Sequence, residues 1–350
     1  MSRAPGAAPR RFVLIGAGFW GRFQLAAWGE NPHAVCVGVC DQDRAKAEAL
    51  GGPLGIPAYE DPAAMLADLR PDFADIVTPV HTHVPLIRLC AEKGVPVICQ
   101  KPLAASVAEA EQALGACQKA GVSLLVHENW RWQTPLRTAG AWLKAGRIGA
   151  PFRARLSFVC SFAVFDNQPS LAALPQFILT DIGSHVLDVA RSLFGEAASV
   201  YAQTQRLHPN IRGEDVATVV MPMGAGRTTV TCEMSYASRT EHERFPQTYL
   251  FVEGEGGSLE VGPDYLLRVT DASGTHLTRH APPRFAWADP AYDLVQASMV
   301  PCQADLLAHL RGEKIAETVG ADNLETLRLV FAAYESAATG TVVRSIAQTR

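Results

Sequence analysis

The stretch Phe12-Val-Leu-Ile-Gly-Ala-Gly-Phe-Trp-Gly21 decides the fold of the first part of the chain. A short apolar run of strand length leads directly into the pattern Gly-x-Gly-x-x-Gly, and a helical pattern follows it. In this arrangement Gly16 permits a tight turn, Gly18 lets the backbone approach a pyrophosphate, and Gly21 lets the helix pack closely on the strand. The helix N-terminus then offers unpaired N–H groups to phosphate oxygens. The stretch therefore predicts a dinucleotide-binding loop.

The same loop and the end of the next strand-like run predict the cofactor. Phe19 and Trp20 occupy the variable positions of the loop, so we count them among the cofactor-binding residues. Asp41 ends the next apolar run, at the spacing where a carboxylate accepts hydrogen bonds from the ribose hydroxyls and would repel a 2′-phosphate. We therefore predict NAD, while Arg44 leaves NADP open. The alternative is that Asp41 is an ordinary turn residue.

Strand and helix patterns alternate as far as residue 128. Apolar runs of strand length lie at Phe12–Ile15, Ala34–Cys40, Phe73–Thr78, Val95–Cys99 and Val122–Val126. Helical patterns lie at Phe19–Trp28, Arg44–Leu50, Val84–Glu92 and Val107–Lys119. Such alternation is typical of a parallel sheet covered on both faces. We predict a doubly wound Rossmann domain over residues 1–128.

The pattern changes after that point. Alternating apolar residues share one face of a predicted strand; they are Phe152, Ala154, Leu156, Phe158, Cys160 and Phe162. Further strand patterns lie at Thr228–Met234, Tyr249–Val252 and Ser258–Val261, and helical patterns at Ala291–Leu310 and Asn323–Ala338. Successive strands with few helices between them indicate a largely antiparallel, open sheet. We predict an α+β domain over residues 129–350 for substrate binding and oligomerisation.

Composition excludes several classes of protein. A chain of 350 residues with a net charge of −4 fits two domains and carries no basic footprint for nucleic acid. No apolar run approaches the roughly 18 residues of a membrane helix, and the N-terminal segment lacks a long apolar stretch, so we expect a cytoplasmic protein. The 8 cysteines form no Cys-x-x-Cys pair, so we expect reduced core thiols and no metal site.

Three residues could carry acid–base chemistry. Lys101 follows an apolar strand and precedes Pro102, and ligands of open parallel sheets bind beyond the carboxyl ends of the strands. Asp181 and His185 are spaced to share one face of a helix that ends at Gly195, so the imidazole could take an alcohol proton beside the carboxylate. The simpler alternatives are a solvated lysine, a helix N-cap aspartate and a buried core histidine.

In their order along the chain, these motifs resemble the Gfo/Idh/MocA family of oxidoreductases. The resemblance covers nearly the whole sequence, and its motifs are Gly16-x-Gly18-x-x-Gly21, Thr78-Pro79 with His83, Lys101-Pro102, Asn129-Trp-Arg131-Trp, Asp181-x-Gly183-x-His185, Glu253-Gly254-Glu-Gly256 and Tyr334-Glu-Ser336. Two positions depart from the family pattern. Gln100 replaces the usual glutamate of Glu-Lys-Pro, and Val80 stands where asparagine is common.

The resemblance implies a Rossmann domain followed by an α+β domain whose open sheet often forms an oligomer interface, so we expect a dimer or tetramer. It implies that Lys101, Asp181 and His185 are catalytic and contact the substrate. The cofactor-binding set extends to Thr78, Pro79, His83, Gln100 and Lys101. The dense polar and aromatic stretch at the domain junction adds Asn129, Trp130 and Arg131 as substrate-binding residues, although hinge packing explains them equally well.

The resemblance also implies an NAD-dependent dehydrogenase that oxidises a hydroxyl of a small sugar or polyol. His127–Trp132, together with Cys99–Pro102, is similar to a subgroup that includes D-apiose dehydrogenases, which oxidise a branched aldopentose to its lactone. Two alternatives stay open: an NAD-dependent glycosidase of the same superfamily, and a non-catalytic NAD-binding sugar sensor. A sensor needs no acid–base set, so the presence of Lys101, Asp181 and His185 argues against it.

Overall fold

The computed structural model describes residues 8–241 and 245–344. They form two compact units. The described residues of 1–128, 286–288 and 299–324 make the first unit, and those of 129–285, 289–298 and 325–350 make the second. The sequence analysis assigns 286–288 and 299–324 to the second domain. Contacts made late in the chain explain the difference, since the Gln303 amide donates to the Gln24 carbonyl and the Thr318 hydroxyl donates to the Val126 carbonyl.

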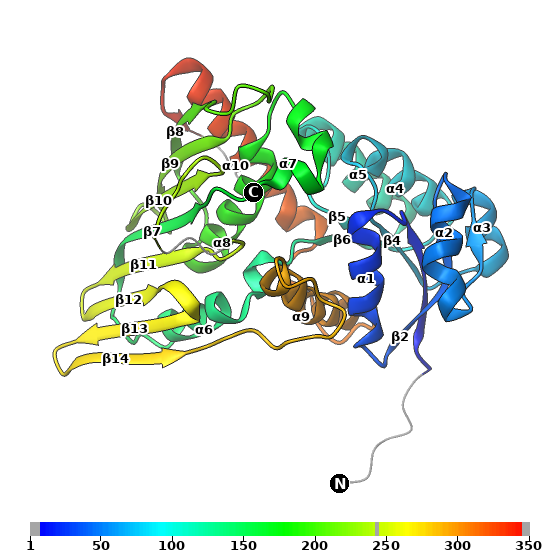
Figure 1. The fold of residues 1–350 in the computed structure, drawn as a ribbon, viewed down its shortest axis with the longest axis horizontal. Coiled ribbons are helices and arrows are strands. Elements are labelled where there is room, and N and C mark those ends of the chain that lie inside the picture. The colour runs from blue at the N-terminus through cyan, green and yellow to red at the C-terminus, as the bar shows by residue number, and fades with distance from the viewer. Residues whose placement is uncertain (1–7, 242–244, 345–350) are drawn as a thin grey trace, which may run out of the picture. The chain divides into compact units, whose positions relative to one another are not determined.

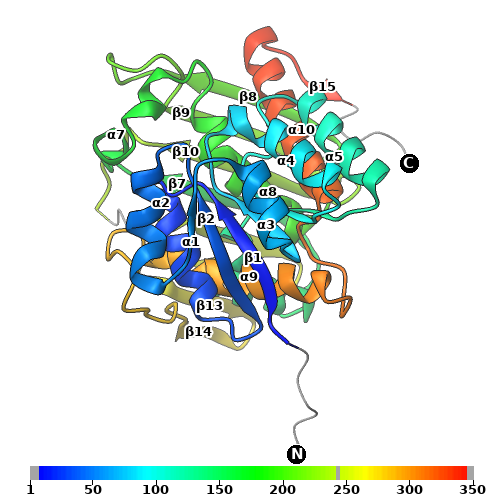
Figure 2. The ribbon, with the colours of Figure 1, turned by 90° about the vertical axis from the view of Figure 1, so that its right-hand side faces the viewer.

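The first unit is a parallel sheet of 6 strands in the order β3-β2-β1-β4-β5-β6 (Figure 1). Its strands are β1 (Arg10–Ile15), β2 (Ala34–Cys40), β3 (Ala58–Tyr59), β4 (Phe73–Ile76), β5 (Val97–Gln100) and β6 (Leu124–His127). Its helices include α1 (Phe19–Gly29), α2 (Arg44–Gly51), α3 (Pro62–Leu69), α4 (His83–Glu92) and α5 (Val107–Ala120). Figure 2 shows α1 and α2 on one side of the sheet and α4 and α5 on the other. This strand order is that of a Rossmann fold, which confirms the predicted class.

The sequence analysis missed two elements of this unit, β3 and α3. The short strand β3 has too few residues to show a periodicity. The helix α3 did carry a signal, because the Asp61 carboxylate accepts a hydrogen bond from the Ala63 N–H and Pro62 occupies the first helical position. An N-cap aspartate followed by proline is a recognisable helix start.

The second unit contains a sheet of 9 strands in the order β14-β13-β12-β11-β7-β10-β9-β8-β15. Its strands are β7 (Pro151–Val159), β8 (Ser199–Gln205), β9 (Val216–Met223), β10 (Thr228–Ser235), β11 (Tyr249–Gly254), β12 (Gly257–Val261), β13 (Leu266–Asp271), β14 (Gly274–Arg279) and β15 (Val343–Arg344). Its helices are α6 (Thr134–Lys144), α7 (Val164–Asn167) and α8 (Ser184–Phe194), with parts of α9 (Asp293–Leu310) and α10 (Gly320–Thr339). Among the described strands of this sheet, only the pairing of β7 with β10 is parallel, so the predicted α+β class is confirmed.

The predicted buried face of β7 is wrong at the first residue of its alternating pattern, Phe152. Ala154, Leu156 and Phe158 are buried, but Phe152 is 49% exposed. The register between β7 and β11 shifts there, because Glu253 pairs with Arg153 while Gly254 pairs with Pro151. The extra residue of this bulge is Phe152, and a bulge turns its side chain off the regular alternation.

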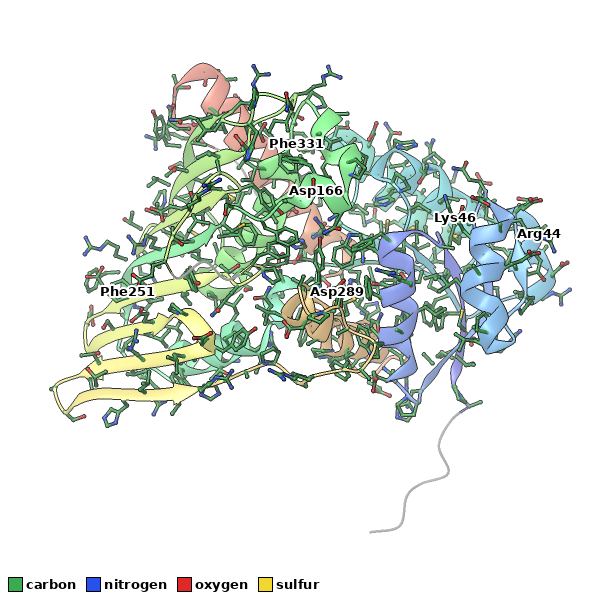
Figure 3. All side chains as sticks on the ribbon, in the orientation of Figure 1. Arg44, Lys46, Asp166, Phe251, Asp289 and Phe331 are labelled. Carbon is green, nitrogen blue, oxygen red and sulfur yellow. The ribbon has the colours of Figure 1, made fainter. Side chains whose placement is uncertain are left out.

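The sheet of the second unit also exposes large apolar side chains. Phe251 and Tyr201 are each 37% exposed, and Figure 3 labels Phe251 on β11. The oligomer expected from the resemblance stays a prediction. Within the described residues, no helix is both long and apolar enough to cross a membrane.

Candidate active site

Of the three glycines in the loop after β1, Gly16 and Gly21 are sterically required and Gly18 borders open space. Gly16 has φ +110°, and a Cβ there would lie 2.2 Å from the Val77 carbonyl oxygen. A Cβ at Gly21 would lie 2.2 Å from the Gly16 carbonyl oxygen, so helix and strand approach too closely for any side chain. At Gly18, by contrast, a Cβ would meet no described atom within 4 Å. The loop therefore leaves open space above the N-terminus of α1, which fits a pyrophosphate.

Phe19 and Trp20 are the first two residues of α1. They are partly buried against an apolar cluster that contains Phe23 and Met299. The rings of Phe19 and Trp20 meet edge to face with centroids 5.3 Å apart. These contacts support a packing role for the two residues, while their contact with a cofactor stays a prediction.

Asp41 joins the end of β2 to the glycine loop. One carboxylate oxygen accepts a hydrogen bond from the Ala17 N–H at 2.8 Å, and the other accepts from the Asp43 N–H at 2.9 Å. Arg44 is more than half exposed and pairs with Glu48 on the same helix at 2.8 Å. Figure 3 shows Arg44 on α2 near Lys46. The carboxylate of Asp41 thus lies beside the loop where a ribose would follow a pyrophosphate.

His83 connects the segments that follow β4 and β5. It is 1% exposed; its Nε2 lies 2.9 Å from the Thr78 carbonyl oxygen, and its Nδ1 lies 3.0 Å from the Pro102 carbonyl oxygen. Burial lowers the pKa of His83, so the neutral ring donates to one of these carbonyls. His83 therefore fixes the two strand ends, and Pro79 lies between Thr78 and this histidine.

Lys101 is half-buried directly after β5, and its peptide bond to Pro102 is cis. The Gln100 side chain folds back so that its Oε1 accepts the Lys101 N–H at 3.2 Å. The Gln100 amide nitrogen donates to Gln24 at 3.2 Å. Gln100 therefore holds the backbone of Lys101 at the carboxyl end of the sheet.

In the second unit, Asp181 lies within a π-helical turn, Leu179–Gly183, that continues into α8. Its N–H donates to the Phe177 carbonyl at 2.8 Å, so the N-cap alternative for Asp181 is wrong. The Tyr236 hydroxyl forms a hydrogen bond with the Asp181 carboxylate. Burial, and then the charge of Asp181, raise the pKa of Tyr236 well above its usual value. The Tyr236 hydroxyl therefore stays protonated and donates a hydrogen bond to the Asp181 carboxylate.

Sequence reasoning missed Tyr236. It follows β10 directly and is 3% exposed. The only signal in the sequence was a tyrosine at the end of a predicted strand, which is common in any buried sheet. Its partnership with Asp181 depends on tertiary packing.

His185 is 4% exposed and stacks on Trp130, with ring centroids 4.2 Å apart and an angle of 21° between the planes. The Trp130 indole N–H donates to the Thr248 hydroxyl at 2.8 Å. The indole is therefore fixed at its edge while its face supports the imidazole. This contact was not expected from the sequence, because residues 130 and 185 lie far apart along the chain.

The neighbours of Trp130 also have partners inside the second unit. The Asn129 amide donates to the Val295 carbonyl and to the Ser298 hydroxyl, each at 2.9 Å. Arg131 makes a two-pronged ion pair with Asp188, with N–O distances of 2.7 and 2.6 Å, and both residues are buried. These contacts support the packing explanation for Asn129 and Arg131, while their contact with substrate stays a prediction.

No group of three or more His, Cys, Asp or Glu side chains that could hold a metal ion occurs in the described part of the chain. The 8 cysteines are free thiols, and all but Cys36 are buried. Burial raises the pKa of Cys40 to about 12 and that of Cys117 to about 11. Such thiols stay protonated at neutral pH and are poor nucleophiles.

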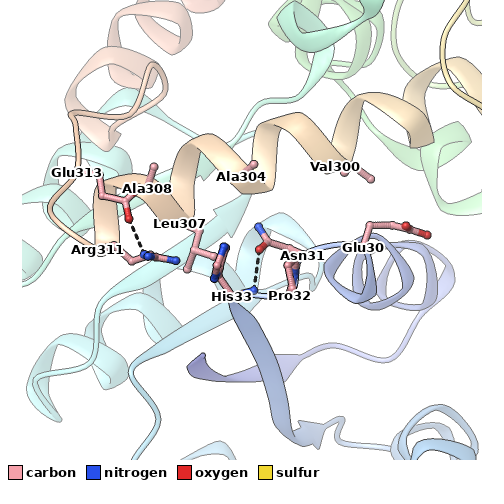
Figure 4. A pocket seen from close by; sticks show the side chains of 10 residues that line it. All are labelled: Glu30, Asn31, Pro32, His33, Val300, Ala304, Leu307, Ala308, Arg311 and Glu313. Carbon is pink, nitrogen blue, oxygen red and sulfur yellow. Dashed lines mark hydrogen bonds and ion pairs between the residues drawn. The ribbon is translucent and has the colours of Figure 1, made fainter. Parts of the chain in front are cut away.

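A groove of about 260 Å³ in the first unit lies away from these residues (Figure 4). Its lining includes Glu30 and Asn31, which follow the C-terminal end of α1, and Leu307 and Arg311 from the end of α9 and beyond. The glycine loop is at the opposite end of α1, about 16 Å away at 1.5 Å per residue. This groove is therefore not the cofactor site.

Comparison with known proteins identifies the class. Residues 10–128 match the model of the oxidoreductase family with an NAD-binding Rossmann fold, and residues 136–260 match the Gfo/Idh/MocA C-terminal domain. The chain therefore belongs to the Gfo/Idh/MocA family and is an NAD-dependent dehydrogenase, as predicted. It is 44% identical over 332 residues to a D-apiose dehydrogenase of Paraburkholderia graminis, covering 95% of this chain and 88% of that protein.

Two further relatives agree with this class. A D-apiose dehydrogenase of Rhizobium rhizogenes is 40% identical, with coverage of 95% of this chain and 96% of the relative. A solved oxidoreductase of Agrobacterium radiobacter, in complex with NAD⁺, L-tartaric acid and magnesium, superposes with a TM-score of 0.94 at 39% identity, covering 96% of this chain and 98% of that one. The open glycine loop and Asp41 fit the NAD that the family binds.

We expect Asp41→Ala to weaken NAD binding and to narrow the preference for NAD over NADP. The carboxylate binds ribose hydroxyls and repels a 2′-phosphate, and both effects are lost in the variant. Asp41→Asn is the matched variant, because it removes the charge and keeps an acceptor for the Ala17 N–H. The measurement is kcat/KM with each cofactor. A wild-type enzyme that already favours NADP would contradict this role of Asp41.

A second prediction concerns the buried ion pair. Asp188→Ala leaves the Arg131 guanidinium buried without its carboxylate, so we expect the free energy of unfolding to fall by about 3–5 kcal/mol. Glu253→Ala removes a partner from the exposed Arg153–Glu253 pair and serves as control, with little expected change. Urea unfolding followed by circular dichroism measures both. An equal free energy of unfolding for the two variants would show that the buried Arg131–Asp188 pair does not stabilise the fold more than the exposed pair does.

Proposed function

We propose that this chain oxidises D-apiose at C1 to the lactone, with NAD as hydride acceptor. The observation that carries the proposal is the identity of 44% and 40% to two D-apiose dehydrogenases over 95% of the chain. Cys99-Gln100-Lys101-Pro102 and His127–Trp132 are similar to the same subgroup and support the proposal. When bound, NAD supplies the acceptor for the hydride that leaves C1 of the sugar.

In the proposed reaction His185 takes the proton of the C1 hydroxyl while the C1–H bond breaks and the C1=O bond forms. The stacking of His185 on Trp130 supports this role, because it restricts the ring to one plane. Asp181 stabilises the imidazolium that forms, and the hydrogen bond with Tyr236 limits the freedom of that carboxylate. These residues all belong to the second unit.

Lys101 belongs to the first unit and has a separate role in the proposal. Its ammonium group stabilises the negative charge that develops on the C1 oxygen as the proton leaves. Its position after the carboxyl end of β5 supports this role, because ligands of such sheets bind beyond that edge. The alternative is that a deprotonated Lys101 acts as the base.

We expect wild-type protein to accumulate NADH steadily with D-apiose, and Lys101→Met to lower kcat by about 10²-fold or more with little change in NAD affinity. Lys93→Met, at an exposed lysine of the same unit, is the control. Initial rates of NADH absorbance and NAD titration measure the two quantities. A glycosidase would release no NADH, and a sensor would bind sugar without turnover. Either result would overturn the proposal.

The pH dependence separates the two candidate bases. A histidine base acts only when neutral, so kcat/KM for D-apiose should fall at low pH along one ionisation. His185→Ala should lower the rate at neutral pH and flatten this acidic limb, and Asp181→Asn should retain partial activity. His276→Ala, in exposed β14, is the control. An unchanged acidic limb in His185→Ala would make Lys101 the base.

A further inference from the structure

A carboxylate lies at the centre of the parallel sheet of the first unit. Asp75 is in β4, paired between Leu14 of β1 and Ile98 of β5, and is fully buried. The Trp28 indole N–H donates to its Oδ2 at 2.6 Å. The Gln24 amide nitrogen donates to both oxygens, at 3.0 and 3.2 Å. A carboxylate inside an apolar sheet is costly, and these donors from α1 compensate the cost.

From Asp75 an unbroken line of hydrogen bonds runs to Lys101. Gln24 turns its NH₂ group to Asp75, so its Oε1 faces the other way and accepts from Gln100 Nε2 at 3.2 Å. Gln100 in turn directs its Oε1 to the Lys101 N–H, also at 3.2 Å. The second hydrogen of Gln100 Nε2 points to Nδ1 of His127 at 3.3 Å, which therefore accepts.

Asp75, at one end of this line, sets the direction in which its hydrogen bonds are donated. An ionised carboxylate only accepts, so it fixes which way the Gln24 amide faces, and Gln24 fixes Gln100. Only in this orientation does the Lys101 N–H meet an oxygen. Burial raises the pKa of Asp75 to about 7, against the bonds from Trp28 and Gln24 that lower it, so Asp75 is ionised in mildly alkaline buffer. The neighbouring thiols Cys36 and Cys99 stay protonated, because burial raises the pKa of each.

We infer that Asp75 is a positioning residue for Lys101, acting through the side-chain amides of Gln24 and Gln100. The inference rests on the proposed function, in which Lys101 is catalytic. It also accounts for Gln100, which stands where the family pattern has glutamate. A glutamate at this position would turn an acceptor toward Gln24 Oε1, which is itself an acceptor. The carboxylate of Asp75 therefore requires a donor, such as the amide of Gln100, at position 100.

A cycle of isosteric variants tests the inference. The measurements are made in mildly alkaline buffer, about one and a half pH units above the pKa of about 7 for Asp75. Asp75→Asn brings an N–H group against Gln24 Nε2, and Gln100→Glu sets two acceptors against each other. We expect each single variant to lower kcat by about tenfold, since each leaves a buried polar group unpaired or reverses the amides before Lys101. KM for NAD should change little.

The double variant Asp75→Asn/Gln100→Glu restores a continuous line with reversed polarity. The carboxylate introduced at position 100 would then accept from the Lys101 N–H and from Gln24 Nε2, while Gln24 Oε1 accepts from the amide introduced at position 75. We expect kcat to recover to within about threefold of wild type. Ile98→Val, a buried change in β5 outside the line, is the control for lost stability and should keep its kcat. A double variant no better than the worse single variant would overturn the inference.

A second measurement distinguishes a failure of the inference from a failure of the proposed function. The nitrogen NMR shifts of the His127 ring report its tautomer, with Nδ1 accepting in wild type and donating to the introduced carboxylate in the double variant. If the wild-type protein forms no NADH with D-apiose, the proposed function fails while the tautomer change still reports the line. If Lys101→Met is inactive and Asp75→Asn has wild-type kcat, the inference alone fails.

Discussion

The first unit depends on two backbone contacts that leave no room for a side chain. The Gly16 carbonyl oxygen occupies the place where a Cβ of Gly21 would be, at 2.2 Å, and the Val77 carbonyl oxygen does the same for Gly16. These contacts bring the N-terminus of α1 against the carboxyl ends of β1 and β4. Any substitution by a residue with a Cβ would push α1 outward, and the N–H groups of its first turn would lose their position. The anion-binding property of the loop is thus a consequence of close packing.

The second unit uses a different device to hold its functional turn. The Glu214 Oε1 accepts hydrogen bonds from the Phe177 and Leu179 N–H groups, at 3.1 and 3.2 Å, and from the Tyr334 hydroxyl at 2.5 Å. A carboxylate is well suited to the start of a helix, where several N–H groups lack partners. Glu214 therefore anchors the π-turn that carries Asp181. A π-turn is often found at functional sites, since it changes the direction of side chains along one helix.

The sequence predicted what backbone geometry and periodicity determine. The glycine loop, Asp41, the β–α alternation and the change to antiparallel strands all leave local patterns in the chain. The π-turn at Asp181, the Tyr236 partner and the stack of Trp130 on His185 leave none, because each is formed by segments distant in sequence. Phe152 was misassigned because a bulge depends on the partner strand. The assignment of 299–324 to the first unit was missed for the same reason, since its contacts are made with α1 and β6.

The helix α1 links the glycine loop to the strand that ends before Lys101. Its N-terminus lies beside Gly18, and farther along the helix Gln24 and Trp28, one turn apart, donate to the same carboxylate in β4. The carboxylate of Asp75 is fully buried, and the hydrogen bonds from Gln24 and Trp28 of α1 compensate the cost of burying it. Gln24 therefore connects the helix that follows the glycine loop to Gln100, the residue before Lys101.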